Sequence, residues 1–179
     1  MTHEPGATAL GKQIRTLLLE QDEPIAPRSE ALLFAADRAH HVATVIRPAL
    51  DRGEIVLTDR YIDSSLAYQG AGRTLSLAEV KQLSSWATER LVPDLTVLLD
   101  IAPEAGLARI HVRTGQTGPD RLEREALAFH ERVRAAFCEL AGAEPERYLV
   151  LDATRPVDAL AADVLATTQA LIESRGAAG

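Results

Sequence analysis

Hydrophobic positions along the chain follow two alternating patterns. Three short stretches, at residues 54–59, 95–100 and 147–152, are almost continuously apolar and rich in Leu or β-branched residues. This pattern is typical of strands that are buried on both faces of a parallel sheet. Longer amphipathic stretches alternate with them, which predicts βαβ units and therefore a doubly wound α/β fold.

The amphipathic stretches carry apolar residues at the three- and four-residue spacing of a helix. Ser76 and Glu79 have the spacing of a capping box, and Pro103 and Pro156 occupy predicted helix starts. Pro48 is expected to kink or end the second helix. The predicted helices span residues 8–20, 29–51, 76–90, 103–113, 121–141 and 156–174.

Composition narrows the class of protein. The chain has 179 residues, of which 46% are hydrophobic and 25% charged, as expected for one globular domain over residues 1–179. The apolar runs are too short for a membrane span and no secretory signal is visible, so we expect a cytoplasmic protein. The lone Cys138 excludes a disulfide framework and is expected to be buried. A net charge of −7 disfavours a large nucleic-acid-binding face but not a mononucleotide site.

One glycine-rich stretch near the start of the chain imitates a phosphate-binding loop. Gly6 to Lys12 fits G-x-x-x-x-G-K, but Gln13 stands where such a loop needs a Ser or Thr for Mg²⁺. The loop also needs a buried strand upstream, and only five residues precede Gly6. We therefore interpret the stretch as a turn that enters a helix.

The second predicted helix carries a candidate nucleobase site. Phe34 and Arg38 lie one turn apart, on the side away from the predicted core stripe. An aromatic face beside a planar guanidinium suits a nucleobase, which has a π-face and carbonyl edges. A surface cation–π pair would have the same spacing.

A second cluster begins at the carboxyl end of the strand predicted over 54–59. Arg60 can bind a phosphate there, and Asp59 can hold a metal-bound water or orient Arg60. Hydroxyl and amide groups suited to base and sugar edges follow, at Ser64, Ser65, Tyr68 and Gln69. A polar strand end followed by a short helix is the alternative interpretation.

A third cluster surrounds residues 114–120, which contain two Gly and one Pro. A glycine-rich loop between arginines predicts a lid over a polyphosphate, and a solvated charged hinge is the alternative. The flanking charged residues are Arg109, Arg113, Asp120, Arg121 and Glu123.

In this order along the chain, the clusters resemble the thymidylate kinase family, which phosphorylates dTMP with ATP. The most specific part is D-R-Y followed by S-S and Y-Q-G within residues 59–70. Weaker but correctly ordered matches are T-H-E-P-G at 2–6, F-A-A-D-R at 34–38, P-D-L with L-D at 93–100, and D-R-L-E at 120–123.

The resemblance implies a P-loop-kinase-like, doubly wound parallel sheet and assigns roles by position. Phe34 would stack on thymine, Arg38 would donate to a base carbonyl, and Arg60 would bind the dTMP phosphate with Glu4 nearby. Asp59 would act through Mg²⁺ or its waters, and ATP would be the co-substrate of an in-line transfer. The implied nucleoside pocket adds Ser64, Ser65, Tyr68 and Gln69; Asp59, Arg60, Arg113 and Arg121 are the expected catalytic residues, and Arg109, Asp120 and Glu123 the other lid residues.

The sequence departs from the family pattern near its start. His3 stands where the family has Arg, and the 179 residues lack counterparts of the family's first strand, its P-loop and most of its second strand. We therefore expect a slot where the central first strand would lie, and little phosphoryl transfer by these residues alone. The family implies a homodimer that uses the helix at 29–51; His40 and His41 are expected on the surface.

Two alternatives to a dTMP kinase stay open at this point. One is a non-catalytic relative that binds nucleotide only at the acceptor site. The other is a structural module that dimerises through the long helix.

Overall fold

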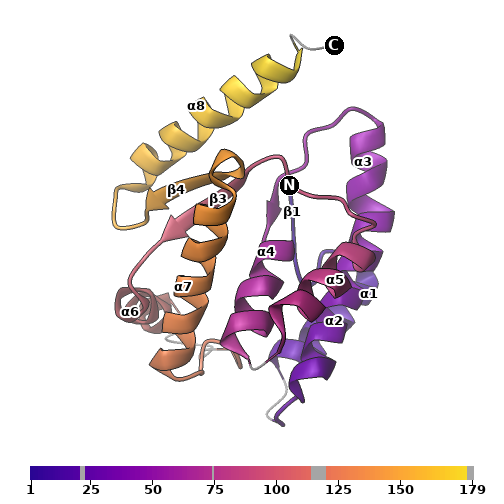
Figure 1. Cartoon of the computed structure of the whole chain (residues 1–179), viewed down its shortest axis with the longest axis vertical. Coiled ribbons are helices and arrows are strands. Elements are labelled where there is room, and N and C mark those ends of the chain that lie inside the picture. Colours follow the sequence, from indigo (N-terminus) through magenta and orange to yellow (C-terminus); the bar gives the residue numbers. More distant parts are fainter. Residues whose placement is uncertain (21–22, 74, 114–119, 177–179) are drawn as a thin grey trace.

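Four short strands form two parallel pairs in the computed structural model, which describes residues 1–20, 23–73, 75–113 and 120–176 (Figure 1). Strand β1 (Thr2–His3) pairs with β2 (Thr58–Asp59), and β3 (Thr96–Asp100) pairs with β4 (Tyr148–Asp152). Parallel strands separated by helices confirm the α/β class. Along the described residues the two pairs are separate sheets, so the expected single sheet is not formed.

The strand predicted at 54–59 is much shorter than expected. Its neighbour β1 is only two residues long, and the N–H groups of Thr2 and of Glu4 just beyond it donate to the carbonyls of Leu57 and Asp59. A ladder extends only as far as its shorter partner. Ile55 and Leu57 consequently remain 70% and 59% exposed, although their pattern predicted burial on both faces.

Helices surround the two strand pairs (Figure 1). Helix α7 packs against both β3 and β4 and also against η2, and α8 packs against β4. Over the described residues, the helical elements are α1 (Ala9–Leu19), α2 (Pro27–His41), η1 (Val42–Ile46), α3 (Arg47–Asp51), α4 (Ile62–Ser65), η2 (Leu66–Gly72), α5 (Leu77–Ala87), α6 (Pro103–Arg113), α7 (Leu127–Ala143), η3 (Pro145–Arg147) and α8 (Val157–Gly176).

The helix predicted at 29–51 does not end at Pro48, because the chain stays helical to Asp51, but it loses its regular α-helical hydrogen bonding just before this proline. A π-helical turn, η1, lies directly before α3, which has Pro48 in its first turn. In a regular helix the proline ring would clash with the carbonyl of Thr44, and the wider π turn relieves that clash.

Two other helix starts differ from the prediction. Ser76 makes no side-chain capping hydrogen bond at α5, so the capping box is not formed. Helix α7 begins at Leu127 rather than near residue 121. The preceding residues form a turn that Asp120 and Glu123 close, because each backbone N–H donates to the other's carboxylate.

Small hydrophobic clusters form the core. One joins η2 to α7 through Ala67, Phe129, Val133 and Ala136. Cys138, on the same helix, was wrongly expected to be buried with this cluster. Cys138 lies two positions beyond Ala136, and two residues rotate a helix by about 200°. Its side chain is therefore exposed on the opposite face of α7.

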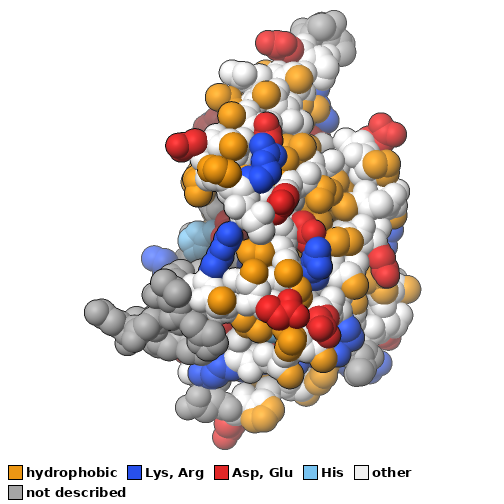
Figure 2. Space-filling view, turned by 90° about the vertical axis from the view of Figure 1, so that its left-hand side faces the viewer, with side chains coloured by type: hydrophobic (Ala, Val, Ile, Leu, Met, Phe, Trp, Pro, Cys, Tyr) orange, Lys and Arg blue, Asp and Glu red, His pale blue; other side chains and the backbone are white. Residues whose placement is uncertain are grey.

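Hydrophobic side chains also remain exposed on helix α8. Val157, Leu165 and Ile172 are 78%, 58% and 45% exposed, and Figure 2 shows hydrophobic side chains between charged ones on one face of the molecule. None of the helices in the described ranges combines the length and hydropathy that a membrane span requires.

Candidate functional site

One cavity collects most of the predicted site residues. Its volume is about 720 Å³, and its walls come from β1 and the turn after it, α1, α2, the end of β2, the α4–η2 segment, α6, the turn at 120–123 and α7. The predicted residues that line it are Glu4, Phe34, Arg38, Asp59, Arg60, Ser64, Ser65, Tyr68, Gln69, Asp120 and Glu123. Three sequence clusters that are distant along the chain therefore meet in one place.

Arg38 is the most tightly held of these residues. Its Nε donates to Glu4 Oε2 at 2.7 Å and its Nη1 donates to Ser65 Oγ at 3.0 Å. Its guanidinium also lies 5.6 Å from the centre of the Tyr61 ring. Arg38 is only 2% exposed, so helix α2 presents a buried, fixed cation to the cavity rather than a surface cation–π pair.

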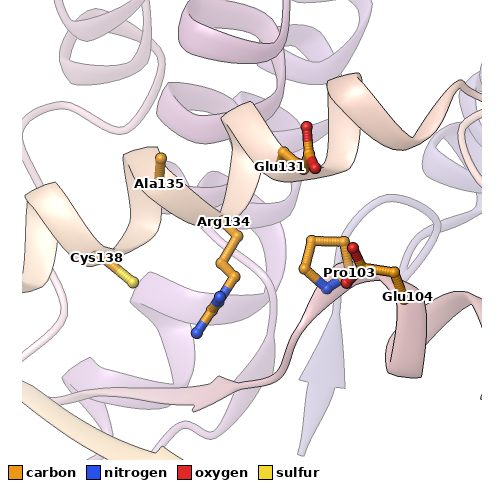
Figure 3. Close-up of a pocket in the computed structure, with 6 residues that line it drawn as sticks. All are labelled: Pro103, Glu104, Glu131, Arg134, Ala135 and Cys138. Atoms are coloured by element: carbon orange, nitrogen blue, oxygen red, sulfur yellow. The ribbon is translucent and has the colours of Figure 1, made fainter.

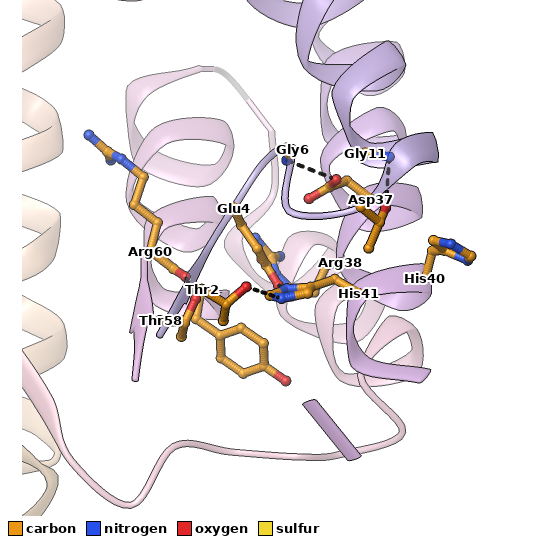
Figure 4. A network of polar contacts seen from close by, with 12 residues as sticks. Thr2, Glu4, Gly6, Gly11, Asp37, Arg38, His40, His41, Thr58 and Arg60 are labelled. Carbon is orange, nitrogen blue, oxygen red and sulfur yellow. Dashed lines mark hydrogen bonds and ion pairs between the residues drawn. The ribbon is translucent and has the colours of Figure 1, made fainter. Parts of the chain in front are cut away.

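Arg60 contrasts with Arg38 because it is exposed. It follows β2 directly, with φ at 65° in the left-handed region that non-glycine residues seldom adopt. Its guanidinium lies 5.0 Å from the centre of the Tyr68 ring, and its side chain extends away from Glu4 and Arg38 (Figure 4). The cavity thus has one buried arginine and one exposed arginine.

The glycine-rich stretch at Gly6 is a turn, as interpreted from the sequence. Thr8 caps α1 by accepting a hydrogen bond from the Gly11 N–H at 2.8 Å. The Gly6 N–H donates to Asp37 Oδ1 at 3.1 Å, so a carboxylate already accepts from the amide that a phosphate would need (Figure 4). Burial raises the pKa of Asp37, which is 1% exposed.

A second buried network lies beside the cavity, around Glu30. Its carboxylate accepts hydrogen bonds from Gln69 Nε2 at 3.1 Å, from Arg73 at 3.2 and 3.3 Å, and from Arg121. Burial raises the pKa of Glu30, but the hydrogen bonds from Arg73, Gln69 and Arg121 outweigh this effect and lower it overall. The network ties α2 to η2 and to the turn before α7.

The predicted lid residues have different environments. Arg121 binds Glu30 and donates to the Leu18 carbonyl, and Arg109 donates to the Ala153 carbonyl at 3.0 Å. Neither lines the cavity. The side chain of Arg113 and residues 114–119 of the predicted lid loop lie outside the described part of the chain.

Several residues in or beside the cavity were not predicted from the sequence. His41 was wrongly expected on the surface and is 0% exposed, because α2 packs this face against β1. His130 of α7 lines the cavity, and its buried Nε2 has no hydrogen-bond partner among the described residues. Arg15 of α1 lines it too and donates to the Pro5 carbonyl. No local motif marks these residues, since only tertiary packing places His130 and Arg15 at the cavity and buries His41 beside it.

The described residues contain no group of three His, Cys, Asp or Glu side chains suited to a metal ion. Asp59 is an exposed carboxylate on the cavity wall, beside Arg60. Mg²⁺ is commonly held by one or two carboxylates together with substrate phosphates and water. Asp59 therefore fits a Mg²⁺ ion that enters with a nucleotide, although not a cage made by the protein alone.

A second hollow, of about 400 Å³, lies between α6 and α7 (Figure 3). It contains none of the predicted site residues, and it is lined by Pro103, Glu104, Glu131, Arg134, Ala135 and Cys138. Arg134 is already paired with Asp100 at 2.7 and 2.8 Å. The chemistry expected from the sequence therefore belongs to the larger cavity.

Comparison with known proteins decides the family. The model of the thymidylate kinase family matches residues 1–164. This chain belongs to the thymidylate kinase family. Members named thymidylate kinase are phosphotransferases, so the kinase class expected from the sequence is confirmed.

Curated relatives match over nearly the whole chain. A thymidylate kinase of Clavibacter michiganensis is 57% identical over 178 residues, which cover 99% of this chain and 83% of the relative. A thymidylate kinase of Deinococcus radiodurans is 55% identical, covering 93% of this chain and 79% of the relative. The crystal structure of thymidylate kinase from Ehrlichia chaffeensis is similar with a TM-score of 0.67 at 31% identity, covering 84% of this chain and 71% of that one.

Proposed function

We propose that this chain is a nucleoside monophosphate kinase that converts ATP and dTMP to ADP and dTDP. The observation that carries the proposal is the buried Arg38 in the same cavity as Phe34 and the exposed Arg60. Phe34 offers a face for thymine, and Arg38 still has Nη2 for a base carbonyl, since Nε and Nη1 are already bonded. Arg60 offers an exposed cation for the 5′-phosphate.

The proposed roles of the remaining residues follow their chemistry. Ser64, Tyr68 and Gln69 would line the sugar and base pocket, and Asp59 would hold Mg²⁺ directly or through water. Mg²⁺, when bound with ATP, would neutralise charge on the transferring phosphoryl group. The protein itself performs no covalent step: its residues orient dTMP, and Arg60 offsets charge at the acceptor phosphate.

Residues 114–120 are proposed as a lid that supplies cations to the phosphates. Arg109 and Arg121 are both engaged elsewhere, at Ala153 and Glu30, so each would have to exchange partners to reach a nucleotide. Arg113 remains the simplest candidate for a lid cation. Asp120 and Glu123 would hold the end of the lid through their reciprocal hydrogen bonds.

The donor side is proposed to be incomplete within residues 1–179. These residues contain no G-x-x-x-x-G-K followed by Ser or Thr, the sequence that cradles ATP phosphates. The two strand pairs do not join into one sheet along the described residues, which supports a further strand between them. We propose that residues 1–179 bind dTMP more tightly than ATP and transfer phosphoryl groups poorly by themselves.

A homodimer is proposed for the same chain. Leu32 of α2 is 57% exposed, and Leu50 of α3 is 39% exposed. Apolar side chains on this long helical segment suit a contact with a second copy. Sedimentation or light scattering that gives a monomer mass at micromolar concentration would contradict the dimer.

Calorimetric titration tests the nucleotide site. We expect the chain to bind dTMP, and Arg60→Ala to weaken dTMP binding about tenfold or more while the melting temperature stays unchanged, because a charge-assisted phosphate contact is lost from an exposed side chain. The matched control is Arg134→Ala, which removes an arginine outside the cavity and should leave dTMP binding unaltered.

Two outcomes would separate the proposal from its alternative. Binding of dTMP without phosphoryl transfer, even when a separate polypeptide restores the donor loop, would favour a non-catalytic nucleotide-binding relative. No binding of dTMP at all would contradict both.

A further inference from the structure

The buried histidine of α2 is connected to the cavity through a chain of hydrogen bonds. His41 Nδ1 lies 2.8 Å from Glu4 Oε1, and the other carboxylate oxygen, Oε2, accepts from Arg38 Nε at 2.7 Å. His41 Nε2 lies 2.7 Å from Thr2 Oγ1 (Figure 4). His41, Glu4 and Arg38 are 0%, 4% and 2% exposed, so water does not replace these contacts.

The ionised carboxylate of Glu4 determines which groups donate hydrogen bonds in this network. An ionised Glu4 paired with Arg38 can only accept hydrogen bonds, so His41 must carry its proton on Nδ1. In the tautomer with its proton on Nδ1, Nε2 is an acceptor and the Thr2 hydroxyl donates to it. Each polar atom of the imidazole then has a hydrogen-bond partner.

We propose that His41 is a positioning residue for nucleobase binding, acting through Glu4 on Arg38. Glu4 has three rotatable side-chain bonds, and the bond from His41 fixes the plane of its carboxylate. That plane in turn fixes the Arg38 guanidinium, since its Nε–H and one N–H of Nη1 are held, and its remaining N–H groups on Nη1 and Nη2 are then presented to a ligand in a fixed direction. The inference rests on the proposed function, because it names Arg38 as the group that meets the base.

Two conservative substitutions of His41 distinguish its positioning role from a simple loss of side-chain volume. The amide nitrogen of an asparagine takes the place of histidine Nδ1, whereas that of a glutamine takes the place of Nε2. His41→Asn keeps a donor for Glu4 and should bind dTMP within about threefold of the unaltered chain. His41→Gln loses that donor and should bind dTMP about tenfold more weakly.

The neighbouring histidine provides the matched control. His40 precedes His41 on α2, is only partly buried, and its side chain points away from Glu4 (Figure 4). His40→Gln should leave dTMP affinity unchanged. Thr2→Val, a nearly isosteric change at the edge of the network, should weaken dTMP binding about two- to fivefold.

A double-mutant cycle tests the route through Arg38. In an Arg38→Gln background, His41→Gln should cost little further dTMP affinity, because the guanidinium that it positions is already gone. A purely structural role would lower the affinity by the same factor in both backgrounds. Melting temperatures without ligand identify any variant that fails to fold. If a His41 variant does not fold, the dTMP affinity of Thr2→Val tests the network in its place.

The outcomes distinguish this inference from the proposed function. Unchanged dTMP binding by His41→Gln, or an equal loss in both backgrounds, would overturn the positioning role alone. Failure of the unaltered chain to bind dTMP would overturn the proposed function and this role with it.

Discussion

Among single substitutions, we expect a large loss of stability when the buried carboxylate of Glu30 is removed. Replacement of Glu30 by Gln keeps the side-chain shape but removes the charge that Arg73 and Arg121 share. Glu30 is 0% exposed, and the two arginines are 18% and 11% exposed. Both cations would lose their common buried partner.

The expected cost follows from these contacts. Breaking a buried ion pair by removing one partner costs about 3–5 kcal/mol. Arg73 retains its contact with Glu125, and glutamine still accepts one hydrogen bond, so the lower end, about 3 kcal/mol, applies. At about 2.1 cal/mol/K per residue over 179 residues, this loss lowers the melting temperature by about 8 °C.

The loss of stability caused by Glu30→Gln should depend on pH in a definite direction. The pKa of Glu30 lies below its ordinary 4.5, so its stabilisation is complete above pH 4.5 and is lost as the pH falls through the folded-state pKa. The glutamine variant has no such group. The difference in unfolding free energy between the two proteins should therefore be constant from about pH 5 to 7 and shrink below about pH 4.5. Asp37, present in both, does not affect the difference.

Urea denaturation of both proteins at pH 7 and pH 4 measures this difference. The control is Glu79→Gln, because Glu79 pairs with Arg28 at 3.5 Å with both side chains exposed, and such a pair contributes at most about 1 kcal/mol. A loss below about 1 kcal/mol for Glu30→Gln at pH 7, or a difference that grows on acidification, would refute the reasoning.

The remaining predictions concern the face of η2 and α7. A Cβ at Gly72 would lie 2.7 Å from Phe129 Cε2, so Gly72→Ala should lower the free energy of unfolding by about 1–3 kcal/mol; an unchanged urea midpoint would contradict this close packing. Cys138 is exposed, so an aromatic disulfide reagent should titrate its thiol in the folded protein, and reaction only after unfolding would mean that it is buried. Arg134→Ala should leave the urea midpoint nearly unchanged, because its pair with Asp100 is exposed to solvent, and a shift as large as that of Glu30→Gln would show that this pair is structural.

The candidate site itself was largely predictable. Asp59, Arg60 and the hydroxyl and amide residues after them stand together in the sequence, and a strand end followed by a short helix keeps neighbours together in space. Phe34 and Arg38 are one helical turn apart, so forming the helix is enough to bring them together. These predictions needed only the geometry of one helical turn and of one strand end. All of these residues line the cavity.

Networks that join distant segments were not predictable in this way. Glu30 and Arg121 are 91 positions apart, and no periodicity relates them. The sequence marked Gln69 as a pocket residue but not as a donor to Glu30. Nothing in the sequence around His41 distinguishes it from a surface histidine. Only the packing of α2 against β1 buries it.

The amino-acid sequence alone determined the alternation of strands and helices, the family and the identity of most cavity residues, because these depend on periodicity and on residues close together in the chain. The tertiary structure decided which carboxylates hold which arginines and which face of each helix is buried. It also decided that the strands form two pairs along the described residues. The physical reason is that burial and hydrogen bonding between distant segments are set by packing, and many side-chain patterns satisfy the same local rules.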